Sequence, residues 1–145
     1  MNNKIKFWED EDREIVNPEL FSEVADKWAK DIKESGKKKK DKNKISQLRK
    51  FYDEVLTFHG RIKNDEEFQK MLPYIKILNA KAYYAEGRNL ITEEFRMFLK
   101  ECINQIRSKK DFDVFVKFFE AFMGFYRYYD EKNEIKEATD ETKRN

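Results

Sequence analysis

The sequence predicts an all-α protein, a compact bundle of about five helices with flexible termini. Three observations lead to this prediction. The chain has 145 residues, enough for one domain with a single core, and only 4 Gly and 2 Pro interrupt it. Its apolar residues recur at alternating intervals of three and four, the spacing of one helix face. No stretch alternates apolar and polar residues for long enough to indicate a strand.

The chain divides into three parts. Residues 1–16 are mixed acidic and aromatic, and we expect this N-terminal arm to pack through Phe7 and Trp8. Residues 17–130 form a single helical domain. Residues 131–145 contain one large apolar side chain among many charges, so they cannot offset the entropy of folding and we expect a disordered tail.

The first helix of the domain is expected from 18 to 34. Asn17 and Pro18 are the typical N-cap and first helical residue. An apolar stripe follows at helical spacing until Ser35 and Gly36 interrupt it.

Two further helices follow a lysine-rich loop at residues 35–44. An apolar stripe predicts the second helix from about 44 to 63. The third begins at Asp65, which we interpret as its cap, and ends at Gly87 as a C-cap. Pro73 should kink this helix or split it in two.

Thr92 predicts the start of a fourth helix, and a fifth is expected from about 112 to 129. The fifth carries a wide aromatic face: Phe118, Phe119, Phe122, Phe125 and Tyr126. Such a face usually belongs to the core. It is wider than one small bundle needs, so contact of part of it with another protein chain is the alternative.

The cations of the chain are concentrated locally, because its formal net charge is only +2. Six occupy the loop: Lys37, Lys38, Lys39, Lys40, Lys42 and Lys44. Three more lie on the second helix: Arg49, Lys50 and Arg61. A helix N-terminus disfavours nearby cations, so neutralisation by nucleic-acid phosphates would explain their position. A merely solvated loop is the alternative.

The sequence offers little for catalysis. It has one histidine, His59, and one cysteine, Cys102, both on apolar helix faces, and no phosphate-binding or zinc-protease motif. We expect no enzyme activity, cofactor or metal, with a metal-dependent nuclease as the alternative. The lone cysteine, the lack of a long apolar run and the N-terminal residues predict a cytoplasmic protein without a membrane segment.

Three segments in this order resemble the small all-helical subunit of the type III-A CRISPR effector (Csm) complex. The first is KISQLRKFYDEV, in which Ser46 to Phe51 match a Ser/Thr-Gln-Leu-Arg-Lys-Phe stretch. The second, LPYIKILNAKAYYAEGR, matches a proline-containing helix that ends in Gly87 and Arg88. The third, FVKFFEAFMGFYRYY, matches an aromatic helix containing Phe-Glu-Ala at residues 119–121.

This resemblance, over about residues 18–130, implies a non-catalytic structural role in antiviral defence. Subunits of that family stack as a short filament beside guide and target RNA and contact phosphates without reading sequence. The resemblance implies RNA contact by Arg49 and Lys50 most directly and by Arg88 next. It implies other subunits of the complex as partners, and apolar helix faces suggest self-association, for the isolated chain as a homodimer. A stand-alone protein–protein adaptor is the alternative function.

Overall fold

The computed structural model describes residues 4–144, with side chains described through Lys132. Five α-helices dominate the described chain, which confirms the all-α bundle. The elements in order are β1 (Trp8–Asp10), β2 (Ile15–Val16), the π-helix η1 (Leu20–Val24), α1 (Ala25–Lys38), α2 (Ile45–Arg61), α3 (Asp65–Gly87), α4 (Glu93–Asn104) and α5 (Lys109–Arg144).

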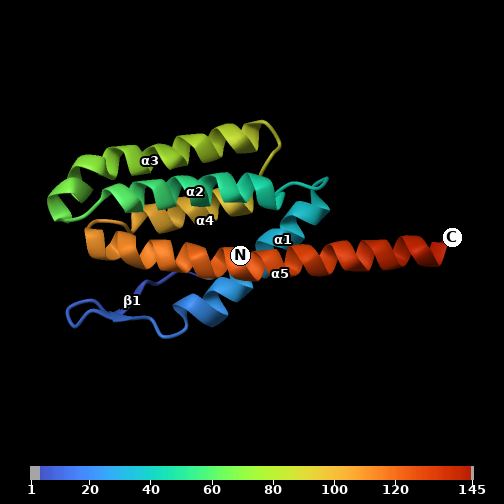
Figure 1. Ribbon diagram of the computed structural model, residues 1–145, viewed down its shortest axis with the longest axis horizontal. Coiled ribbons are helices and arrows are strands. Elements are labelled where there is room, and N and C mark those ends of the chain that lie inside the picture. Colours follow the sequence, from blue (N-terminus) through green and yellow to red (C-terminus); the bar gives the residue numbers. More distant parts are fainter. Residues whose placement is uncertain (1–3, 145) are drawn as a thin grey trace.

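Helix α5 is the centre of the bundle. It packs against α1 on one side and α2 on the other, while α3 packs against α2 and α4. Figure 1 shows α2 and α3 side by side, α1 crossing α5, and the last part of α5 projecting beyond the other helices. The α1–α2 and α3–α4 connections lie at the same end of the bundle, and the β1–β2 hairpin lies toward the other (Figure 1).

The core is built mainly from phenylalanine rings of α4 and α5. Phe98 stacks on Phe122 with ring centroids 4.6 Å apart, and Phe122 stacks in turn on Tyr126 at 5.7 Å. The rings of Phe118, Phe119, Phe122 and Tyr126 are fully buried. Most of the aromatic face of α5 is therefore occupied within the chain, as expected of offset-stacked rings in a dense core.

Helix α3 begins and ends close to its expected limits, with different caps. Asn64, not Asp65, is the N-cap, and its side chain accepts a hydrogen bond of 2.9 Å from the amide of Glu67. The helix is continuous through Pro73, so the proline does not split it. Arg88 rather than Gly87 is the C-cap residue. In α4 the expected cap is confirmed, because the Thr92 hydroxyl accepts from the Phe95 amide.

The N-terminal arm contains two short strands that periodicity did not predict. Strands β1 and β2 pair antiparallel around an irregular register, and Glu14 before β2 has a φ of 57°. Phe7 is buried, and the Trp8 indole donates to Asp111 Oδ1 at 2.8 Å, so the arm packs on the domain. Strands of three and two residues are too short for a two-residue repeat to be recognised.

At the other terminus, α5 extends through Arg144, well beyond the expected end near Tyr129. The side chains of 133–145 and the placement of residues 1–3 and 145 lie outside the described residues. Disorder of the charged tail at 131–145, and the division of the chain into arm, domain and tail, stay predictions.

Candidate nucleic-acid interface

The lysine run begins inside a helix, not in a loop. Helix α1 continues through Lys38, so the expected end at residue 34 is wrong, and Lys37 and Lys38 occupy its last turn. A helix C-terminus carries partial negative charge and favours cations there. The lysines at the end of α1 therefore stabilise the helix that precedes them, and only Lys44, the N-cap residue of α2, sits at a helix N-terminus.

Gly36 lets the chain turn back over the end of α1. The amides of Lys39 and Lys42 both donate to the Gly36 carbonyl, at 3.3 and 3.1 Å. A Cβ atom on Gly36 would lie 2.2 Å from the Lys42 carbonyl oxygen, closer than any real contact. Glycine is thus required by close backbone approach, and it remains helical although it was expected to end the helix.

The turn itself is built from left-handed residues. Lys40, Asp41 and Asn43 have φ values of 63°, 57° and 63°. This region is unfavourable for residues with a Cβ, although Asn and Asp tolerate it better than others. Several such residues in succession require fixed contacts elsewhere to hold the backbone.

Those contacts come from Asn43, which is fully buried. Its side-chain amide donates to the Ile32 carbonyl at 3.1 Å and to the Thr92 hydroxyl at 2.8 Å, and its side-chain oxygen accepts from the Thr92 amide at 2.8 Å. Its backbone amide donates to the Leu90 carbonyl at 3.0 Å, and its carbonyl accepts from the Tyr126 hydroxyl. One residue thus joins α1, the α3–α4 connection and α5 to the lysine loop.

The loop lysines surround a shallow hollow of about 440 Å³. Its lining residues are Lys38, Lys39, Lys40, Lys42 and Asn89. Lys42 Nζ donates to Asn89 Oδ1 at 3.3 Å, which places the loop directly against the α3–α4 connection. Arg88 precedes Asn89 in that connection and lies over the ring of Tyr84, 5.7 Å from its centroid. The structure therefore brings Arg88 to the same end of the bundle as the loop.

The remaining predicted cations lie on α2. Arg49 and Lys50 are exposed in its first turns, next to the loop. Arg61 is the last residue of this 17-residue helix. At 1.5 Å per residue it lies about 25 Å from Lys44, so it is not part of the same cluster.

Three residues at this site were not singled out from the sequence: Asn43, Asn89 and Glu94. Glu94, in the first turn of α4, pairs with Lys39 Nζ through both carboxylate oxygens, at 2.9 and 3.4 Å. The hydrogen bond that Lys39 donates to Glu94 raises the pKa of Lys39. Burial opposes ionisation of Glu94, but the hydrogen bond from Lys39 and a backbone hydrogen bond outweigh it and lower the pKa of the carboxyl. Both groups are charged at neutral pH.

His59 and Cys102 occupy structural environments. His59 Nε2 contacts Asp113 Oδ1 at 2.9 Å, and its ring lies 5.7 Å from that of Phe112. Cys102 is fully buried, and burial raises the pKa of its thiol well above the ordinary value. Among the described side chains, no three His, Cys, Asp or Glu residues gather closely enough to hold one metal ion. Every helix in the described part of the chain is too short or too polar to cross a membrane.

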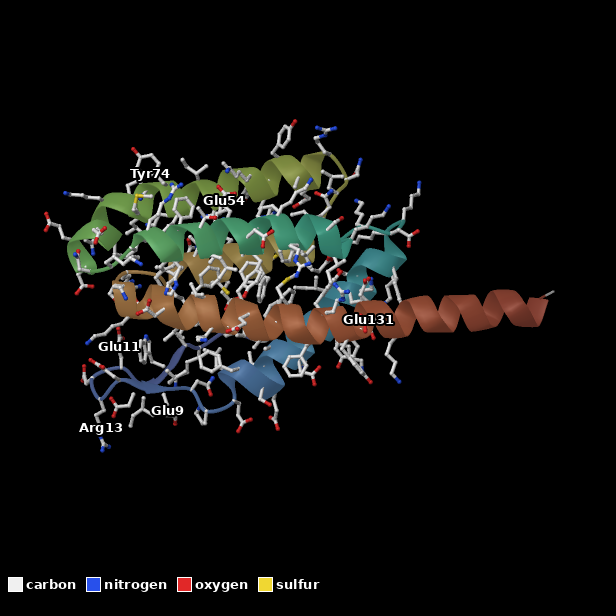
Figure 2. All side chains as sticks on the ribbon, in the orientation of Figure 1. Glu9, Glu11, Arg13, Glu54, Tyr74 and Glu131 are labelled. Carbon is white, nitrogen blue, oxygen red and sulfur yellow. The ribbon has the colours of Figure 1, made fainter. Side chains whose placement is uncertain are left out.

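Apolar side chains are exposed on the outer face of α3. Tyr74, Ile77 and Tyr84 are 56%, 47% and 66% exposed. Their spacing of three and seven residues places them on one face of the helix, and Figure 2 shows Tyr74 pointing away from the bundle. A second apolar surface is a groove between η1 and α5 that includes Phe21, Phe125 and Tyr128.

Comparison with known proteins identifies the family. No curated protein and no solved structure matches the chain. The family model described as Csm2 Type III-A matches residues 16–132. This range runs from the last residue of β2 through η1 and α1 to α4, and it includes α5 as far as Lys132. The chain therefore belongs to the Csm2 type III-A family, whose members are subunits of the type III-A CRISPR effector complex.

Proposed function

We propose that this chain is a non-catalytic, RNA-binding structural subunit of the effector complex. In this role it stacks with further copies along the guide–target RNA, contacts phosphates without reading bases, and contributes to antiviral defence in the cytoplasm. Its partners are the guide RNA, the target RNA and the other subunits of the complex. Family membership supports the place in the complex, and the cationic end of the bundle supports the contact with RNA.

The observation that carries the RNA contact is the cationic hollow at the α1–α2 loop. Four lysines line it on a backbone that Asn43 fixes to three other segments. Lysine ammonium groups act as point charges toward phosphate and do not discriminate bases. Arg88, Arg49 and Lys50 extend the same positive surface, whereas Arg61 would reach a separate stretch of backbone.

Binding of labelled RNA to the purified chain tests this proposal. Single-stranded RNA and an RNA duplex are titrated from low to physiological salt, with parallel EDTA and Mg²⁺ arms. We expect weak, sequence-independent binding, with log affinity falling linearly against log salt. Cleavage that requires Mg²⁺ would instead support the nuclease alternative, and absence of binding at low salt would contradict RNA contact by the isolated chain.

Substitution of four lysines at the end of α1 and in the following loop, K37S/K38S/K39S/K40S, should flatten the salt dependence of RNA binding, because fewer counterions are released. A matched control removes the same charge elsewhere, by substituting four exposed lysines with serine: Lys27, Lys30, Lys70 and Lys76. If both variants show the wild-type slope, the loop is merely solvated.

A second candidate function, protein–protein adaptor, is favoured by the exposed Tyr74, Ile77 and Tyr84 on α3. The same apolar faces would support self-association of the isolated chain as a homodimer. Measurement of molar mass across concentrations tests self-association, and Y74K/I77K should shift any dimer to monomer. A strict monomer at every concentration would rule out self-association.

A further inference from the structure

One contact at the cationic hollow opposes its proposed use. Lys39, which lines the hollow, is already paired with an acidic residue of this chain. The other lysines that line it, Lys38, Lys40 and Lys42, form no ion pair within 4.0 Å among the described side chains. The hollow therefore contains both free and occupied cations.

The pair is well defined in geometry. Both oxygens of the Glu94 carboxylate contact Lys39 Nζ, at 2.9 and 3.4 Å, and the partners come from segments 55 residues apart. The backbone of Glu94 is fixed beside the loop, because Glu94 lies in the first turn of α4, which Thr92 caps. Its side chain is only 28% exposed, against 45% for that of Lys39. An acidic residue is also favoured at this helix N-terminus.

A carboxylate held against an ammonium makes the contact that a phosphate oxygen would make there. We propose that Glu94 is an internal competitor of RNA at the cationic hollow, so that it occupies Lys39 until a phosphate displaces it. This inference rests on the proposed RNA contact and adds its regulation. In the free subunit Glu94 lowers the affinity for RNA, and RNA must displace it before Lys39 contributes.

Substitution of the competitor tests the inference. E94Q keeps the shape of the side chain but removes the charge, so Lys39 becomes available to phosphate. We expect tighter RNA binding and a salt dependence that is steeper by about one phosphate, a slope change of about 0.7 for a single strand. An E94Q slope equal to the wild-type slope, or weaker binding, would overturn the inference.

Glu93 supplies the matched control. It lies one residue earlier in the same turn, is exposed, and contacts Arg96 rather than a loop lysine. E93Q removes the same charge from nearly the same place. It should therefore raise the affinity for RNA slightly, through weaker long-range repulsion of the phosphates, without steepening the salt dependence of binding. Equal effects of E93Q and E94Q would mean that only net charge matters, which would also overturn the inference.

A double-mutant cycle with Lys39 sharpens the test. In the wild-type background, where Glu94 occupies the Lys39 ammonium, K39S should change the slope of log affinity against log salt only a little. In the E94Q background, K39S should abolish the increase in slope that E94Q causes. The wild type and K37S/K38S/K39S/K40S are measured in parallel. If the wild type does not bind RNA, the proposed function fails; if it binds through the loop but the cycle shows no coupling, only this inference fails.

Discussion

The β1–β2 hairpin and the α1–α2 loop are fastened to the same core by different means. Figure 1 places them toward opposite ends of the bundle. The segment that leads into the hairpin inserts the apolar side chains of Ile5 and Phe7, 1% and 2% exposed. The loop inserts the polar Asn43, which is also fully buried. The hairpin depends on burial of area, which is not directional, and the loop depends on hydrogen bonds that must all be made together.

Their surfaces also differ in charge. The hairpin region carries five acidic residues, and Figure 2 shows Glu9 and Arg13 on the side of the hairpin that faces away from the bundle. The loop presents lysines around a hollow. In both segments most exposed residues are charged and a few buried residues hold the backbone. An anchor of either kind can therefore be removed without changing the exposed charge.

The largest expected effect comes from the apolar anchor. F7A removes a ring that is 2% exposed and packs edge-to-face against Phe118, 6.4 Å between centroids. We expect the free energy of unfolding to fall by about 4 kcal/mol, from lost burial and the cavity left behind. Chemical denaturation measures it. I15A in the same hairpin is the control, because Ile15 is 42% exposed and its truncation should cost well under 1 kcal/mol. A loss for F7A as small as that for I15A would mean that the N-terminal arm contributes little to the core.

Removal of the polar anchor, Asn43, should lower the free energy of unfolding somewhat less than F7A does. N43A removes the hydrogen bonds from the Asn43 side chain to the Ile32 carbonyl and the Thr92 hydroxyl, and it leaves the buried Thr92 amide without its acceptor. It also places alanine, whose side chain makes no hydrogen bond, at a φ of 63°. We expect a loss of about 3 kcal/mol in the free energy of unfolding.

The N43G variant separates the two causes. It loses the same hydrogen bonds, but glycine adopts the left-handed region freely, so it should be about 1 kcal/mol more stable than N43A. If the two variants were equally stable, the left-handed conformation would not contribute to the effect. If neither differed from the wild type, Asn43 would not anchor the loop.

This contrast explains what the sequence could reveal. The helices follow from apolar periodicity, and the caps at Thr92 and near Asp65 follow from local residue types, so the bundle was predictable. The cluster of lysines was visible as composition. The role of Asn43 was not, because its partners Ile32, Leu90, Thr92 and Tyr126 are 11 to 83 residues away and no local pattern links them.

The sequence also predicts the end of α1 at the wrong residue, for a related reason. Glycine commonly follows the last residue of a helix, so Gly36 in the sequence predicts a helix end. In the structure it is instead the point where the chain returns, and α1 continues to Lys38. The pairing of Glu94 with Lys39 was equally hidden, since the two residues are 55 positions apart.

The smallest of the three effects tests this close approach. Gly→Ala inside a helix ordinarily stabilises, by about 1 kcal/mol. G36A should do the opposite and cost about 2 kcal/mol, because its Cβ would overlap the backbone carbonyl of Lys42, which cannot move without disturbing the left-handed turn. Thermal unfolding with calorimetry measures the change.

The chain supplies a control for G36A in α2. Gly60 is also helical, and a Cβ added there meets nothing within 4 Å. G60A should therefore stabilise the protein by about 0.5–1 kcal/mol through helix propensity alone. Opposite signs for G36A and G60A would attribute the cost at Gly36 to the loop that returns over α1. If G36A were stabilising as well, the loop would not be held against the helix, and the fixed lysine hollow on which the proposed RNA contact depends would lose its support.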